Sequence, residues 1–155
     1  MAKNLRTEIA QTRPFASRQQ EAHLSIMRTA AALDHAVSEA LKPYGVTPAQ
    51  YNILRILRGA GDEGLCRNAV RDRMVAKVPD TTRMLDRMEA AGLVERSRDE
   101  NDRRFVTTRI SDEGLRLTAE LDEPMEALAH KHAGHLTKSE LTMLIDLLAR
   151  IREVL

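Results

Sequence analysis

The sequence predicts a mainly α-helical protein with a small β-hairpin, and three observations support this fold class. Apolar residues recur at spacings of three and four over most of the 155-residue chain, which is the period of amphipathic helices. Only 3% of the residues are aromatic and Trp is absent, so aliphatic side chains and Met must fill the core. Strand-like runs are confined to LVERSR and RFVTTRI, between residues 93 and 110.

The length fits one domain, or one small domain with helical appendages. The single cysteine, Cys66, cannot form an internal disulfide, and the N-terminal residues lack the apolar run of a signal peptide. No window approaches the roughly 20 apolar residues that a membrane span needs. We therefore expect a soluble, cytoplasmic protein.

The N-terminal quarter is expected to form an arm and one long helix. Residues 1–16 have mixed character and include Pro14, which predicts an N-terminal arm. The amphipathic period then predicts a helix over about 17–41, which Pro43 and Gly45 end.

The next helix has the clearest start signal in the chain. Thr47 is a good N-cap, Pro48 follows at the first helical position, and Gln50 completes a capping box. The body of this helix, QYNILRILRGAG, is apolar on more than one side. We therefore expect it to be packed at the centre of the domain.

Two short helices are predicted over about 67–75 and 79–91, and two such helices joined by a tight turn form a helix-turn-helix. One face of the second helix is apolar and carries Met84, Leu85 and Met88. The opposite face is polar and carries Asp80, Arg83, Asp86, Arg87 and Ala90. Gly92 stands at the position of a C-terminal helix glycine, and the hairpin LVERSR-DENDR-RFVTTRI follows.

Two more helices are predicted after the hairpin. Ser111 caps the first, in which Pro124 is expected to cause a kink or a break. Thr137 and Glu140 form a capping box at the start of the second. The second helix has a long apolar stripe, made by Leu141, Leu144, Ile145, Leu148, Ile151 and Leu155.

This order of elements predicts a winged helix-turn-helix over residues 47–111, with a helical dimerisation region over 17–46 and 112–155. The terminal helices have more apolar surface than a three-helix core can cover, and an exposed apolar stripe usually marks an interface. We therefore expect a homodimer with a twofold axis. The alternative is that the terminal helices fold back on their own domain.

The distribution of charge agrees with DNA binding but does not establish it. The whole chain has a net charge of +1, whereas residues 66–110 contain eleven Lys and Arg against eight Asp and Glu. The middle of the chain is therefore mildly basic and the flanks are mildly acidic. A charged run of this size is often only a solvated face.

The run TTRMLDRMEAAGLVERSRDENDRRFVTTRISDEG, residues 81–114, closely resembles the signature of MarR-family transcriptional regulators. It contains the recognition-helix pattern, then LVER, then a wing with D-x-x-D-R-R, then a capped helix with Gly in its first turn. The resemblance covers nearly the whole chain except the arm. It implies a ligand-responsive repressor that acts as a homodimer on a pseudo-palindromic operator in double-stranded DNA.

In a winged helix the recognition helix enters the major groove and the wing reaches the minor groove. Arg is the commonest reader of guanine, and Arg83 and Arg87, four residues apart, point the same way. Thr81 either contacts DNA or faces the core with Met84. The recognition-helix candidates are Pro79, Asp80, Thr81, Thr82, Arg83, Asp86 and Arg87.

In the wing, a narrow minor groove attracts Arg through its negative potential, so Arg103 or Arg104 is expected to enter it. The resemblance implies that Asp102 pairs with Arg104 and sets its direction. Arg96 and Arg98 either contact phosphates or stay solvated. The wing candidates are Arg96, Arg98, Asp99, Asp102, Arg103 and Arg104.

Several MarR-family proteins bind small phenolic or amphipathic effectors between the dimerisation helices and the winged helix. The resemblance therefore suggests an effector pocket lined by His23, Met27, Tyr51 and Arg55, although periodicity equally allows core or rim positions. Cys66 stands where the family commonly has a capping Ser or Thr, and a redox role is not expected. No cofactor is expected, and no metal, because the histidines lack a ligand spacing.

Two other classes of function stay as alternatives. A winged helix can serve as a protein-interaction module without direct DNA readout, in which case the wing arginines would be dispensable. An enzyme is not expected, because the sequence contains no nucleophile with a base at a recognisable spacing, no phosphate-binding loop and no metal-ligand motif.

Overall fold

The computed structural model describes residues 4–98 and 106–155. Within these residues the α-helices are α1 (Leu5–Glu8), α2 (Arg18–Leu41), α3 (Pro48–Ala60), α4 (Arg67–Arg73), α5 (Thr81–Ala90), α6 (Asp112–Ala133) and α7 (Lys138–Arg152). The strands are β1 (Leu65–Cys66), β2 (Val94–Arg98) and β3 (Val106–Ile110), and short 3₁₀ turns follow α2 and α3. The mainly helical fold with a small sheet is therefore confirmed.

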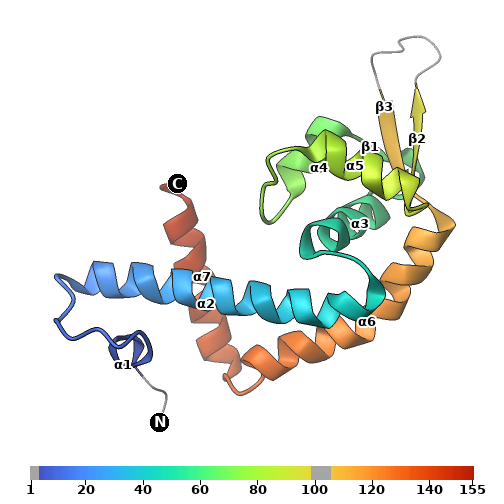
Figure 1. Cartoon of the computed structure of the whole chain (residues 1–155). Coiled ribbons are helices and arrows are strands. Elements are labelled where there is room, and N and C mark those ends of the chain that lie inside the picture. The colour runs from blue at the N-terminus through green and yellow to red at the C-terminus, as the bar shows by residue number, and fades with distance from the viewer. Residues whose placement is uncertain (1–3, 99–105) are drawn as a thin grey trace.

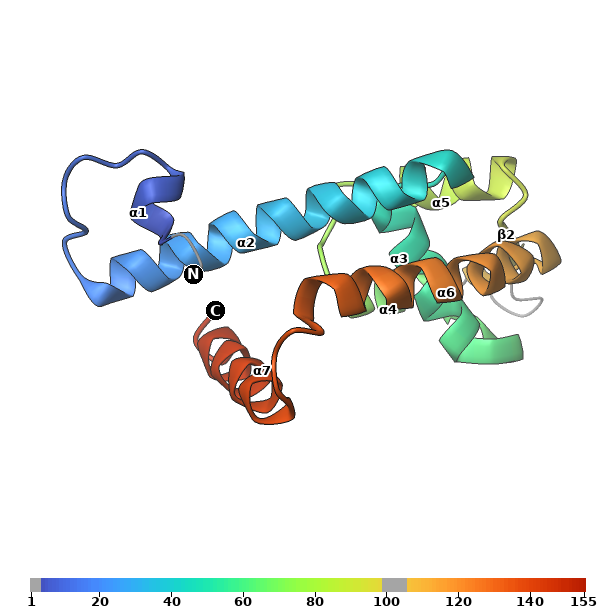
Figure 2. The ribbon, with the colours of Figure 1, turned by 90° about the horizontal axis from the view of Figure 1, so that it is seen from below.

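The molecule has a winged-helix body at one end and an extended helical region at the other (Figure 1). The body contains α3, α4, α5 and the sheet, and the β2–β3 hairpin projects from it. The long helix α2 lies alongside α6, which leads back to the body (Figure 2). Although α7 crosses α2 in Figure 1, Figure 2 shows the two helices apart.

Helix α3 is the centre of the core, as its apolar sequence predicted. Its capping box between Thr47 and Gln50 is formed, and Ile53, Leu54 and Leu57 are completely buried. The helix contacts α2, α4, α6 and β3. Because one helix is covered on several sides, its position determines where the helix-turn-helix and the long helices attach.

The sheet is antiparallel with the order β1-β3-β2. Strand β1 was not predicted, because two residues are too few to show an alternating pattern. Its register pairs Leu65 with Thr108 and Cys66 with Thr107. Gly64, with φ of +67°, precedes it, and a Cβ at this position would lie 2.6 Å from the carbonyl oxygen of Thr108.

The structure corrects two sequence expectations. Of the kink or break expected at Pro124, the break does not occur, because α6 continues from Asp112 to Ala133. Both sides of the proline pack on the core: Leu121, before it, is completely buried and Met125, after it, packs against the core cluster. In addition, part of the expected N-terminal arm is helical, since α1 is capped by the Asn4 side chain.

Two contacts fix α6 to the winged-helix body. Gly114, in the first turn of α6, packs so closely that a Cβ there would lie 2.7 Å from Cγ1 of Ile110. Further along α6, Asp122 accepts hydrogen bonds from both terminal nitrogens of Arg58 on α3, at 2.9 and 2.8 Å. The orientation of the body relative to the long helices is therefore held by packing and by an ion pair.

The hydrogen bonds from Arg58 lower the pKa of the Asp122 carboxyl below its ordinary value of 3.8. A carboxyl with a lowered pKa in the folded state adds stability while it is ionised, and this stability is lost as the pH falls through that pKa. We predict that Asp122→Asn lowers the melting temperature at neutral pH and that its difference from wild type shrinks below about pH 4.

Thermal melts monitored by circular dichroism between pH 7 and pH 3 measure this difference. The exposed neighbour variant Glu123→Gln is the control for removal of a carboxylate from α6. A difference between Asp122→Asn and wild type that stays constant down to pH 3 would contradict the assignment.

Candidate nucleic-acid interface

Helices α4 and α5 form the predicted helix-turn-helix, and the inner face of α5 anchors it. Leu85 and Met88 are buried in the core cluster, and Met84 packs against it. The outer face carries Thr82, Arg83, Asp86 and Arg87, all exposed. Therefore α5 presents a largely exposed polar surface on the side away from the core.

Both ends of α5 are fixed by local hydrogen bonds. At the start, the Asp80 carboxylate accepts from the backbone N–H of Arg83 at 2.9 Å and lies 3.3 Å from the Arg83 guanidinium. At the end, Gly92 has φ of +73°, and its N–H donates to the carbonyl of Glu89. Leu93 donates to Met88 in the same turn, which completes a Schellman motif and leads directly into β2.

Thr81 lies in the core and not on the outer face. It is 5% exposed, and its Oγ1 is buried with no hydrogen-bond partner among the described residues. Of the two roles that the sequence allowed for Thr81, the structure favours the core position. Pro79 and Asp80 are exposed at the helix start, where Asp80 acts as the N-cap.

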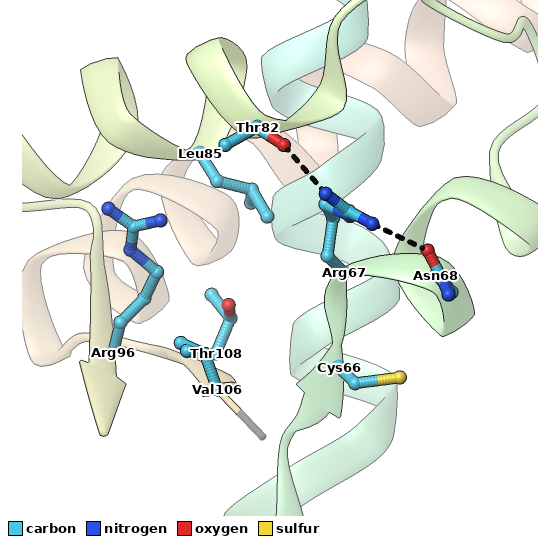
Figure 3. A pocket seen from close by; sticks show the side chains of 8 residues that line it. All are labelled: Cys66, Arg67, Asn68, Thr82, Leu85, Arg96, Val106 and Thr108. Atoms are coloured by element: carbon cyan, nitrogen blue, oxygen red, sulfur yellow. Dashed lines mark hydrogen bonds between the residues drawn. The ribbon is translucent and has the colours of Figure 1, made fainter. Parts of the chain in front are cut away.

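Arg67 belongs to the same surface, although the sequence analysis did not identify it. From the first turn of α4 it donates to Oγ1 of Thr82 at 3.2 Å and to the side-chain oxygen of Asn68 at 3.3 Å (Figure 3). This contact joins the starts of the two helices of the motif. No local pattern indicates it, because the partners are fifteen residues apart.

Arg96 connects the wing to the recognition helix. From β2 its guanidinium contacts Asp86 at 2.6 Å and Glu89 at 2.6 Å, both on α5. The hydrogen bonds that Arg96 donates to Glu89 raise the pKa of Arg96, with a smaller contribution from Asp86. From the sequence, Arg96 was expected either on a phosphate or in solvent; this pairing with α5 was not predicted.

A cavity of about 340 Å³ lies between these elements. Arg67 borders it on the α4 side and Arg96 on the β2 side, with Thr82 above them in the view of Figure 3. The remaining lining residues are Cys66, Asn68, Leu85, Val106 and Thr108. Two guanidinium groups therefore flank one hollow on the surface formed by the helix-turn-helix and the wing.

The other predicted site residues do not all come together. Arg98 is exposed at the end of β2, whereas Asp99, Asp102, Arg103 and Arg104 lie outside the described residues. Of the proposed effector residues, Tyr51 and Arg55 are together, since Arg55 donates to the Tyr51 hydroxyl at 3.2 Å. His23 and Met27 are exposed on α2. In residues 4–98 and 106–155 no cluster of three His, Cys, Asp or Glu side chains could hold a metal ion.

The fold and this surface define a winged helix-turn-helix of the DNA-binding class. The MarR family profile matches residues 44–104. The multiple antibiotic resistance protein MarR of Salmonella typhimurium is 30% identical, over 76% of this chain and 81% of its own length. The crystal structure of a MarR transcription factor from Planctomyces limnophilus is 36% identical, with a TM-score of 0.68, covering 88% of this chain and 98% of that one.

A cysteine-to-serine mutant of MarR from E. coli, solved in complex with operator DNA, shares the fold with a TM-score of 0.76 at 24% identity, over 96% of this chain and 99% of that one. The chain belongs to the MarR family, as the resemblance in the sequence implied. It is a DNA-binding transcriptional regulator. None of its described helices has the length and apolar character of a membrane span.

The buried hydroxyl of Thr81 gives a test of its position. Replacement by Val keeps the shape and removes an unpaired buried polar atom, so Thr81→Val is expected to stabilise the fold by about 1 kcal/mol. Urea denaturation measures this change. The affinity for operator DNA, measured by fluorescence anisotropy, should stay unchanged; a clear loss of affinity in a stable Thr81→Val protein would assign Thr81 to the DNA contact instead.

Proposed function

We propose that this regulator is a ligand-responsive repressor that binds a pseudo-palindromic operator as a homodimer, with α5 in the major groove and the wing in the adjacent minor groove. The observation that carries the proposal is the exposed polar face of α5, with Arg83 and Arg87, beside the wing in a MarR-family chain. The domain limits that follow are residues 47–111 for DNA binding, and 17–46 with 112–155 for dimerisation.

The dimensions of α5 fit a major groove. A helix with its side chains is about 10–12 Å in diameter and the groove is about 12 Å wide, and the ten residues of α5 extend about 15 Å along it. Arg83 and Arg87, one turn apart and exposed, would read base edges, and Thr82 would contact a base or a phosphate. Asp80 and Pro79 set the start of the helix, and Asp80 also holds the Arg83 guanidinium in place before DNA binds.

The wing would supply the second contact. Arg98 stands where β2 ends, and its exposure favours a phosphate contact. We assign Arg103 or Arg104 to the minor groove, with Asp102 directing the Arg side chain and Asp99 in a structural role. This assignment rests on the D-x-x-D-R-R sequence and on the attraction of a narrow minor groove for Arg.

The helical region supports a dimer. Helix α7 has no buried residue in the single chain, and most of its large apolar side chains are exposed, with Ile145 at 61%. Exposed large apolar side chains on the long helices include Met27, Leu33, Met143, Leu144, Ile145, Leu147 and Ile151. A twofold partner would cover this surface and place two α5 helices about one DNA turn apart.

A small phenolic or amphipathic effector would act by shifting the dimer between two spacings of the recognition helices. Tyr51 and Arg55 on α3, with His23 and Met27 on α2, stay the proposed contacts of this effector.

We further propose that the protein acts in the cytoplasm and has no enzymatic role. The alternative of a protein-interaction module without DNA readout is not favoured, because the matched relatives are transcription regulators.

Removal of the Arg83 guanidinium tests the DNA-binding face. Arg83→Ala is expected to weaken operator binding about tenfold or more, which corresponds to the 1–3 kcal/mol of a bidentate Arg–guanine contact. Fluorescence anisotropy with the promoter DNA beside its own gene gives the affinity. The control is Arg116→Ala, which removes an exposed Arg from α6. Equal affinities of Arg83→Ala and Arg116→Ala for the operator would show that Arg83 does not contact DNA.

The dimer is tested on α7. Ile145→Asp places a charge on the exposed apolar face and should convert the dimer to a monomer, because burial of an unpaired carboxylate in the interface is unfavourable. Light scattering after size exclusion measures the mass. Ala119→Asp adds the same charge to an exposed position of α6. If wild type is already monomeric at micromolar concentration, or if Ile145→Asp stays dimeric, the proposed interface is wrong.

A further inference from the structure

Arg96 stands at an unusual place for a wing arginine. It shares a face of β2 with the buried Val94, and its side chain is 22% exposed, although it lies on a projecting hairpin. Its register partner on β3 is Thr108, which is almost completely buried. The guanidinium therefore lies over the inner face of the hairpin base and is directed at α5.

Two carboxylates of α5 converge on this guanidinium. Asp86 and Glu89 are three residues apart and so lie on one face of the helix. Glu89 accepts from both Nε and Nη2 of Arg96, at 2.9 and 2.6 Å, and Asp86 accepts from Nη2 at 2.6 Å. Charge-assisted bonds of this length are the stronger kind, and here they join two elements that both face DNA in the proposed function.

We propose that Arg96 is a positioning residue: its bridge to Asp86 and Glu89 fixes the direction of the wing relative to the recognition helix, and its guanidinium does not serve as a phosphate contact. The inference rests on the proposed placement of α5 and the wing on DNA.

The position of the bridge explains how it can set this direction. Only residues 91–93 separate α5 from β2, and the Schellman turn fixes that junction. On the far side, β1 and the contact of Arg109 with the Asp62 carbonyl hold β3. In addition to these contacts at the two sides of the hairpin, the bridge attaches the middle of β2 to α5. The bridge therefore fixes the direction of β2 relative to α5 up to Arg98, the last described residue before the wing tip.

Electrostatics gives the bridge a second effect. Asp86 and Glu89 would repel phosphates if they were unpaired on a DNA-facing helix. Arg96 neutralises part of this charge at contact distance. If the wing moved away from α5, both carboxylates would lose their cationic partner. The placement of the wing and the repulsion between α5 and the phosphates are therefore coupled.

The proposal and a phosphate contact predict opposite results for the carboxylates. If Arg96 binds phosphate, Asp86→Asn/Glu89→Gln removes repulsion and releases Arg96, so DNA affinity rises. If Arg96 positions the wing, the same double variant breaks the bridge, and we expect affinity to fall about three- to tenfold. The affinity of Arg96→Gln should fall about tenfold, and Arg96→Lys should recover part of that decrease.

The experiment measures operator affinity of the full-length protein by anisotropy between 50 and about 300 mM salt. If Arg96 binds a phosphate, Arg96→Gln reduces the slope of log affinity against log salt by about 0.9, whereas a positioning role leaves the slope unchanged. Because the three side chains act through one bridge, the triple variant Arg96→Gln/Asp86→Asn/Glu89→Gln should bind no more weakly than Arg96→Gln.

The matched control is Arg116→Gln. Arg116 also bridges two carboxylates, Glu113 and Glu120, but on the exposed side of α6. Its replacement should leave affinity and slope unchanged. Circular dichroism melts and mass measurements identify any variant that is unfolded or monomeric. If Arg96→Gln is such a variant, the milder Arg96→Lys replaces it in the same titrations.

Three results would overturn the inference: tighter binding by Asp86→Asn/Glu89→Gln, a slope lowered by about 0.9 in Arg96→Gln, or additive decreases in affinity in the triple variant. Failure of the proposed function looks different. In that case neither wild type nor Arg116→Gln binds promoter DNA at low salt. This result differs from all three above, because each of those requires that the wild type binds.

Discussion

The burial of α3 on several sides is the constraint on which the rest of the structure depends. Ile53, Leu54 and Leu57 are completely buried, and they join α2, α4, α6 and β3 in one core. An element packed on α3 cannot move alone, because its movement would break the apolar contacts between that element and α3. The DNA-facing helix-turn-helix and the long helices are therefore two sides of one rigid centre.

Charged bridges act on top of this core and determine direction more than stability. Arg58 joins α3 to Asp122 of α6, and Arg96 joins β2 to α5. Both pairs are partly exposed, where ion pairs contribute little free energy of folding, but their bidentate or shared geometry restricts the angle between the elements they connect. In the proposed dimer this angle matters, because it sets the spacing of two α5 helices. An effector that changes the angle of the long helices would change that spacing without touching DNA.

The sequence by itself determined the order of the elements and the class of protein. Capping boxes at Thr47 and Thr137, the glycine after α5 and the apolar periods are local signals, because helix ends and amphipathic faces depend on neighbours within a few residues. The motif of α5, LVER and the wing likewise indicated the family. The outer residues of α5 were also predicted, since helical periodicity assigns each position to a face.

Only the tertiary structure decided what depends on residues far apart in the chain. It placed Thr81 in the core, kept α6 continuous through Pro124, added β1 to the sheet, and paired Arg67 with Thr82. It also turned Arg96 inward to Asp86 and Glu89. Periodicity cannot reveal these contacts, because the partner of a long charged side chain is chosen by the angle at which two separate elements pack.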